Sequence, residues 1–193
     1  MHRFFIALFL ALGAPALLTA DAAAQGGHPN IPDTLEFSFP NVEGDTIRLS
    51  DERYRGKVVL VDIFGTWCGP CRRQAPALSE WYEKYQEEGF EIIGIAFEHP
   101  RNKDPKTTLE DYAEKYDLNY EILMGGTIYE VKRKIPELAD LLGLFPTTIM
   151  VDREGAIEGI EFGYEEFMKE DQEGSIEYLL KASVPGEEEK SSD

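Results

Sequence analysis

The chain has 193 residues, of which 42% are hydrophobic and 11% aromatic, enough to bury the core of one globular domain. It carries 37 acidic against 19 basic side chains, a formal net charge of -18. A protein that binds nucleic acid releases counterions from the phosphate backbone and needs a basic surface to do so. The composition therefore excludes a wholly disordered chain and argues against nucleic acid as a partner.

Residues 1–24 have the pattern of a secretory signal peptide. His2 and Arg3 precede an apolar run over 4–18, and Ala22 and Ala24 match a small-x-small cleavage site. The run is shorter than the ~20 residues of a membrane-spanning helix, so an uncleaved membrane anchor is the weaker alternative. We therefore expect a protein exported to the periplasm or another extracytoplasmic compartment, where conditions are oxidising.

The mature chain is expected to form one domain over 34–184, after a polar leader over 25–33. An acidic tail over 185–193 is too polar to pack and is expected to be disordered. No internal repeat interrupts the domain.

Predicted strands and helices alternate along this domain. In chain order, we expect two short extended pieces over 35–50, a buried strand over 57–65, a helix from Cys71 to Gly89, a buried strand over 90–97, a helix starting at Thr107 or Thr108, a weaker strand over 119–126, a helix over 135–144, strands over 145–152 and 156–163, and a last helix over 174–182. The three-residue turn between the last two strands is typical of an antiparallel hairpin. The alternation indicates an α/β layer fold with a mixed sheet.

The chain has only two cysteines, Cys68 and Cys71, between the first buried strand and the helix after it. A bridge between them would close a loop of two residues and add almost no chain-entropy stabilisation, so a structural staple is disfavoured. At the start of a helix, Cys68 would face unpaired amides and the positive end of the helix dipole, which favour its thiolate. Cys71 is close enough to resolve a mixed disulfide formed by Cys68. The spacing predicts a thiol–disulfide exchange centre.

The two residues between the cysteines suit this chemistry. Pro70 fits the first turn of a helix, where its missing N–H has no partner in any case. Gly69 leaves room for another protein to approach the sulfurs.

A metal site is the main alternative for a Cys-x-x-Cys pair. Zinc would need two more ligands, but His2 lies in the signal peptide, His28 in the leader and His99 after a strand, so carboxylates would have to be recruited. A copper-binding chaperone, or a thiol reductant for metal-site assembly, could combine both thiols with His99 and is the runner-up. The leading interpretation requires no metal and no cofactor.

The motif WCGPC and its surroundings resemble the exported TlpA/ResA-like thiol-disulfide oxidoreductases of the thioredoxin superfamily. The similarity spans about 35–163 and includes GDTIRLSDERYRGKVVLVDIFGTWCGPCRRQAP and FPTTIMVDREG. It implies a thioredoxin fold, in which a central mixed β-sheet is flanked by helices on both faces. It also implies a redox-active Cys68–Cys71 disulfide, with Cys68 as the attacking thiol and Cys71 as the resolving thiol.

The resemblance assigns further residues to the client-binding surface. Pro146 matches the family's cis-proline, which lies opposite the cysteines. This would expose the backbone of Phe145 for strand-like pairing with a bound peptide. Trp67 is expected to form a flat contact surface for partner proteins, and shielding of the disulfide is the alternative.

Two positions depart from the family pattern. Many members have an amide six residues before the first cysteine, whereas Asp62 stands here, as in thioredoxins. We expect burial to raise the pKa of Asp62 and Asp62 to relay the proton of Cys71; the alternative is an aspartate that faces water at a strand end. ResA-like members often have a glutamate three residues after the second cysteine, and Gln74 stands here. This argues against a close match to the cytochrome c maturation branch.

The Gly-Pro pair between the cysteines resembles reducing thioredoxins rather than oxidases. It implies clients that are exported proteins with disulfides, as in cytochrome c maturation or disulfide repair, and a membrane thiol-electron transporter as the source of electrons. The protein is expected to be a monomer. A redox-inactive binding module of the same fold is the third hypothesis. A peroxidase of related fold is disfavoured, because it would carry a single peroxidatic cysteine in a Thr-x-x-Cys arrangement.

Overall fold

The computed structural model describes residues 33–136 and 144–182. The expected signal peptide, the tail over 185–193 and all but the last residue of the leader lie outside these residues. Within the two described ranges, no helix is long and apolar enough to cross a membrane.

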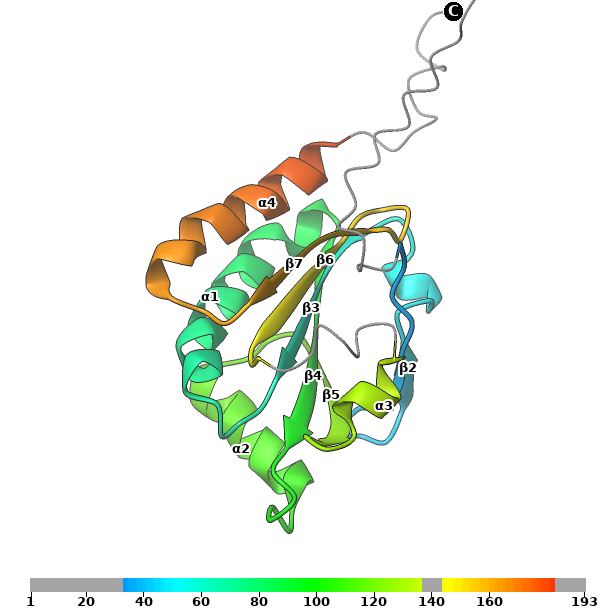
Figure 1. Ribbon diagram of the computed structural model, residues 1–193. Coiled ribbons are helices and arrows are strands. Elements are labelled where there is room, and N and C mark those ends of the chain that lie inside the picture. The colour runs from blue at the N-terminus through cyan, green and yellow to red at the C-terminus, as the bar shows by residue number, and fades with distance from the viewer. Residues whose placement is uncertain (1–32, 137–143, 183–193) are drawn as a thin grey trace, which may run out of the picture.

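A five-stranded mixed sheet lies at the centre of the domain, in the order β5-β4-β3-β6-β7 (Figure 1). The middle strand β3 (Val58–Phe64) runs parallel to β4 (Phe90–Glu98), which runs parallel to β5 (Glu121–Thr127). On the other side of β3, β6 (Thr147–Val151) and β7 (Ile157–Phe162) form an antiparallel hairpin. The predicted mixed sheet and its final hairpin are confirmed.

Helices cover one face of this sheet, and a small hairpin with a one-turn helix covers the other (Figure 1). The first face carries α1 (Gly69–Tyr85), α2 (Pro105–Tyr116) and α4 (Lys169–Lys181). The second face carries β1 (Ser38–Pro40), β2 (Thr46–Arg48) and α3 (Val131–Lys134). Short 3-10 helices occupy Glu52–Tyr54, Gln86–Glu88 and Glu166–Met168.

The apolar run of β3 is buried along its whole length because the sheet is covered on both faces. Side chains of a strand alternate between faces, so Leu60 and Phe64 join the core beneath the helices, while Val61 joins the core beneath the β1–β2 hairpin. Asp62 shares its face with Leu60 and Phe64. The register thus directs a carboxyl group into the apolar layer under α1.

Helix boundaries differ from the sequence prediction at three places. The helix α2 begins at Pro105, before Thr107, because the Asp104 carboxylate caps it by accepting a hydrogen bond from the Thr107 N–H (3.1 Å). The helix α4 begins at Lys169 and runs through Gly174, the residue expected to start it. The one-turn helix α3 was not expected, and 137–143 of the helix predicted over 135–144 lie outside the described residues.

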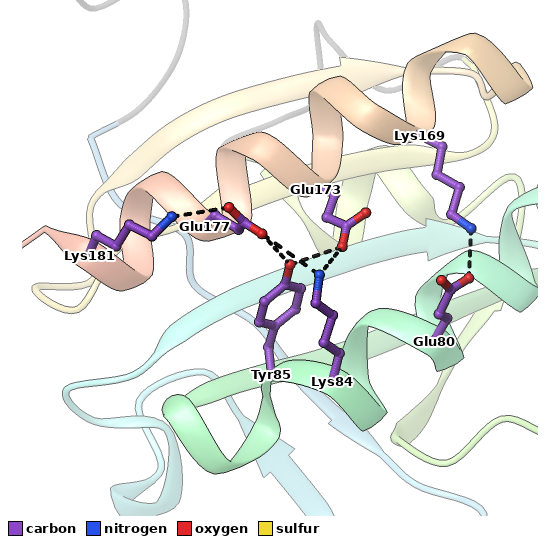
Figure 2. A network of polar contacts seen from close by, with 7 residues as sticks. All are labelled: Glu80, Lys84, Tyr85, Lys169, Glu173, Glu177 and Lys181. Atoms are coloured by element: carbon purple, nitrogen blue, oxygen red, sulfur yellow. Dashed lines mark hydrogen bonds and ion pairs between the residues drawn. The ribbon is translucent and has the colours of Figure 1, made fainter.

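A polar network joins α4 to α1 (Figure 2). The Tyr85 side chain projects from the end of α1, and its hydroxyl lies 2.9 Å from Glu173 Oε1 and 2.8 Å from Glu177 Oε1. Lys84 Nζ forms an ion pair with the same Glu173 oxygen at 2.6 Å. Exposed ion pairs contribute little, so the buried tyrosine is expected to provide most of the stabilisation.

The variant Tyr85→Phe tests this contact. It removes a hydroxyl whose single proton is shared between two carboxylates, and is expected to lower the free energy of unfolding by about 1–2 kcal/mol, measured by urea denaturation. Tyr178→Phe on α4 is the control, because Tyr178 is 71% exposed; it is expected to change stability by less than about 0.5 kcal/mol. Equal effects of the two variants would contradict the prediction.

Candidate active site

Cys68 and Cys71 form a disulfide at the N-terminus of α1. Cys68 is the N-cap residue in an extended conformation, and the Cys71 N–H donates a hydrogen bond to Cys68 Sγ (3.2 Å). Pro70 lies in the first turn, as expected. Backbone amides and the helix dipole therefore point at the Cys68 sulfur, and both would stabilise its thiolate once the bond is reduced.

The disulfide is buried apart from its approach over Gly69. Cys68 is 4% exposed and Cys71 is 3% exposed. Gly69 itself is exposed, and a Cβ added there would meet no atom within 4 Å. The space over Gly69 is therefore open, and its role in the approach of another protein stays a prediction.

Trp67 is held against Phe97 and Phe145 and still presents a surface to solvent. It is 41% exposed, its indole Nε1 donates a hydrogen bond to the Phe97 carbonyl (3.0 Å), and its ring meets that of Phe145 edge-on at 5.3 Å. Gly65 makes this position available, because a Cβ there would overlap the indole and lie 2.9 Å from the Phe97 carbonyl. Sequence reasoning did not identify Gly65; its place between a buried strand and a tryptophan was the only signal.

The Phe145–Pro146 peptide bond is cis, as the family match predicted. Leu144 directly before it is 62% exposed. We refer to Trp67, Leu144 and Phe145 as the apolar margin of the site. Trp67 and Leu144 in this group expose apolar side chains to solvent.

Asp62 is 3% exposed, which rules out the alternative of a carboxylate facing water. Burial raises the pKa of Asp62 to about 8, since desolvation penalises the charged form. Its Oδ1 atom has no hydrogen-bond partner among the described residues. At neutral pH the carboxyl group thus carries a proton in the oxidised protein.

Gln74 stands where ResA-like members often have a glutamate, and it is linked to Asp62 through Thr148. It is fully buried in α1, and its Nε2 donates a hydrogen bond to Thr148 Oγ1 (3.0 Å). Thr148 of β6 is directly opposite Asp62 in the antiparallel pair β3–β6. Asp62, Gln74 and Thr148 therefore form one polar cluster beneath the helices.

Sequence reasoning also missed Glu98, which holds the loop before the disulfide. Its side chain is buried and accepts hydrogen bonds from both the N–H and the hydroxyl of Thr66, each at 2.9 Å. Phe64 pairs with Ala96 in the parallel register, so Thr66 continues alongside Glu98. The signal in the sequence was that Glu98 ends an otherwise apolar strand.

His99, the third ligand of the copper alternative, directly follows β4. Over 33–136 and 144–182, no three His, Cys, Asp or Glu side chains are grouped so that they could hold a metal ion. His99 Nδ1 instead accepts a hydrogen bond from the Arg101 N–H (3.2 Å).

The model of the AhpC/TSA family matches residues 31–160. The chain belongs to the AhpC/TSA family. Thiol-disulfide oxidoreductase ResA of Geobacillus kaustophilus is 34% identical over 144 residues, which are 75% of this chain and 74% of that protein. ResA of Bacillus thuringiensis subsp. konkukian is 28% identical over 151 residues, 77% of this chain and 75% of its own.

Solved structures with the same fold include a thiol:disulfide interchange protein of Chlorobium tepidum, with a TM-score of 0.62 and 22% identity over 78% of this chain and 97% of that one. A secreted disulfide oxidoreductase of Mycobacterium tuberculosis homologous to DsbE has a TM-score of 0.56 and 19% identity, over 74% and 96% of the two chains. The thioredoxin fold is thereby confirmed. This AhpC/TSA family member is a thiol-disulfide oxidoreductase of the ResA type, which sets aside a redox-inactive module.

The raised pKa of Asp62 makes the stability of this AhpC/TSA protein depend on pH. An aspartate ionises near pH 3.8 when unfolded and near 8 when folded, so between these values the folded state binds one more proton. The stabilisation from this extra proton is complete below the lower pKa, falls by about 1.4 kcal/mol per pH unit between the two values, and is lost once the pH has risen through the higher one.

The variant Asp62→Asn lacks this proton and is expected to gain stability over the wild type as pH rises. Urea denaturation of the oxidised proteins at about pH 5 and about pH 9 measures the difference, since disulfide-bonded cysteines do not titrate. A difference between variant and wild type that stays constant with pH would contradict the burial of an unpaired acid.

Proposed function

We propose that this protein reduces disulfide bonds in exported client proteins, with Cys68 as the attacking thiol and Cys71 as the resolving thiol. The position of Cys68 as the N-cap of α1 is the observation that most supports this assignment, because only one of the two sulfurs faces the helix amides. The exposed approach over Gly69 supports attack at the same sulfur.

The exchange proceeds in two steps. The Cys68 thiolate attacks one sulfur of the client disulfide, and the other client sulfur leaves as a thiolate that takes a proton from water. Cys71 then gives its proton to the ionised form of Asp62 and attacks Cys68 Sγ, which releases the second client sulfur. Two electrons pass to the client, and the protein is left with the Cys68–Cys71 bond seen in the structure.

Asp62 has the opposite role when the protein is reduced again. An incoming thiolate attacks Cys68, and Cys71 leaves as a thiolate that needs a proton. Since burial raises the pKa of Asp62 to about 8, its carboxyl group holds that proton at neutral pH. One buried acid thus acts as base in one direction and as acid in the other.

The apolar margin is proposed to receive the client chain. Trp67 directly precedes Cys68, Leu144 directly precedes Phe145, and both side chains are exposed. The backbone of Phe145, before Pro146, would pair with an extended client segment. This arrangement suits clients whose disulfide lies in an accessible, extended segment.

The cellular setting of the proposal follows from the expected signal peptide over 1–24. An extracytoplasmic compartment is oxidising, so the dithiol has to be regenerated by a thiol-electron transporter in the membrane. Cytochrome c maturation and repair of wrong disulfides are the two client processes proposed.

Trapping of clients tests the order of attack. A Cys71→Ser variant expressed in the native host is expected to accumulate mixed disulfides through Cys68, because the resolving thiol is missing. Non-reducing electrophoresis and mass spectrometry of the captured proteins would separate haem-protein maturation from general repair. A Cys68→Ser variant is the control and is expected to capture far less; equal capture by both variants would overturn the assignment.

The proton role of Asp62 is tested by the pH dependence of disulfide reduction by a small dithiol. In the wild type the rate constant is expected to change near pH 8, where Asp62 ionises. Asp62→Asn should lack this step and react at least about tenfold slower at neutral pH. Asp111→Asn on the exposed side of α2 is the matched control, expected to behave like the wild type. An unchanged profile in Asp62→Asn would remove Asp62 from the mechanism.

A further inference from the structure

A cavity of about 410 Å³ lies between α4 and the β6–β7 hairpin. Its innermost lining includes Thr148 and Gln172, which are 2% and 1% exposed, and its outer lining includes the exposed Glu158 and Tyr178. The cavity therefore runs from the solvent to Thr148, the residue opposite Asp62.

Three polar side chains form a row across the sheet on the face that carries this cavity. Thr148 is the register partner of Asp62 in the β3–β6 pair and of Glu161 in the β6–β7 pair. Directly opposed residues of antiparallel strands point their side chains to the same side of a sheet, and their Cα atoms lie within about 5.5 Å of each other. Glu161 is only partly buried, so this row links the buried acid to the surface.

Oxygen atoms without partners surround the row. Asp62 Oδ1, Gln74 Oε1 and Gln172 Oε1 are buried and have no hydrogen-bond partner among the described residues. Their side chains are nonetheless tied to the row, because Gln74 donates to Thr148 and Gln172 donates to Glu161. Buried polar groups left unpaired are costly, and a bound water often satisfies them. Of these three side chains Gln172 lines the cavity, whereas Asp62 and Gln74 meet it only through Thr148.

Two buried tyrosines and the disulfide lie on the other sides of Asp62, in the core beneath the helices. Tyr112 from α2 and Tyr120 before β5 face Asp62, but burial raises the pKa of both phenols, so they stay neutral. Cys71 lies on the α1 side in a disulfide that is itself buried, and under the proposed function a bound client would cover that side further.

We propose that the cavity is a water-filled route by which Asp62 exchanges its proton with the solvent, with the Thr148 hydroxyl as the relay and Glu161 at the outer end. A hydroxyl donates one hydrogen bond and accepts two, so Thr148 can accept from Gln74 and still pass a proton along. The need for such a route rests on the proposed function, in which Asp62 exchanges a proton with Cys71. Asp62 holds a proton at neutral pH and has to release it before its carboxylate can accept the proton of Cys71.

Hydrogen–deuterium exchange of the Asp62 carboxyl group tests the relay. Infrared spectroscopy of the oxidised protein should show a carboxylic acid C=O band that Asp62→Asn lacks, and its shift after rapid transfer into D2O gives an exchange rate. Thr148→Val keeps the shape but removes the hydroxyl, and is expected to slow this rate at least about tenfold. Thr148→Ser keeps the hydroxyl and should stay within about twofold of the wild type.

A second variant blocks the cavity without removing a polar group. Gly159 lines the cavity, and a Cβ there meets no atom within 4 Å. Gly159→Phe should fill the space and slow the exchange like Thr148→Val, whereas Gly159→Ala should leave it unchanged. Exchange as fast as in the wild type in either Thr148→Val or Gly159→Phe would overturn the route.

These measurements are independent of thiol chemistry. They use the oxidised protein without a client, so they report proton exchange even if Asp62→Asn leaves the pH profile of disulfide reduction unchanged. In that case the proton role in the proposed function would fail while the route stands; a fast exchange in the blocked variants would remove only the route.

Discussion

The packing of α1 against the central strand β3 is the interaction on which the rest of the structure depends. Leu78 and Trp81 of α1 are almost completely buried in the same core as Leu60 and Phe64 of β3. This contact sets the start of the helix at the end of the strand, so the N-cap position falls on Cys68. The same contact excludes water from the face of β3 that carries Asp62. Activation of one sulfur and desolvation of one acid therefore have a common cause.

Two buried polar groups accompany the site. Glu98 holds Thr66, in the loop before the disulfide, through two hydrogen bonds, and Thr148 with Gln74 belongs to the cluster around Asp62. Both carboxylate oxygens of Glu98 have hydrogen-bond partners. The cluster around Asp62 retains unpaired oxygens beside a cavity, which lowers stability but leaves Asp62 able to change its protonation state. Stability is thus reduced at the position where proton transfer is proposed.

Much of the fold was predictable because its core strands are continuous apolar runs bounded by clear turn residues. The strand before the cysteines, the mixed sheet and the final hairpin were all expected and confirmed. The prediction that α4 starts at Gly174 was wrong. A glycine inside a helix costs only about 1 kcal/mol, so Gly174 did not have to mark a boundary. The hydrogen bond of Gln74 to Thr148 was not predicted, because the two residues are 74 positions apart and local sequence patterns do not reveal such a contact.

The sequence by itself determined the cysteine pair, its place at a helix start and the succession of strands and helices along the chain. These features depend on neighbouring residues, whose spacing sets periodicity, capping and turns. Only the tertiary structure decided that Asp62 is desolvated without a charged partner, that Thr148 joins it to Gln74, and that a cavity reaches this cluster. Burial and cavity shape depend on how α1, α4 and the β6–β7 hairpin pack together, and such packing brings together residues that are distant along the chain.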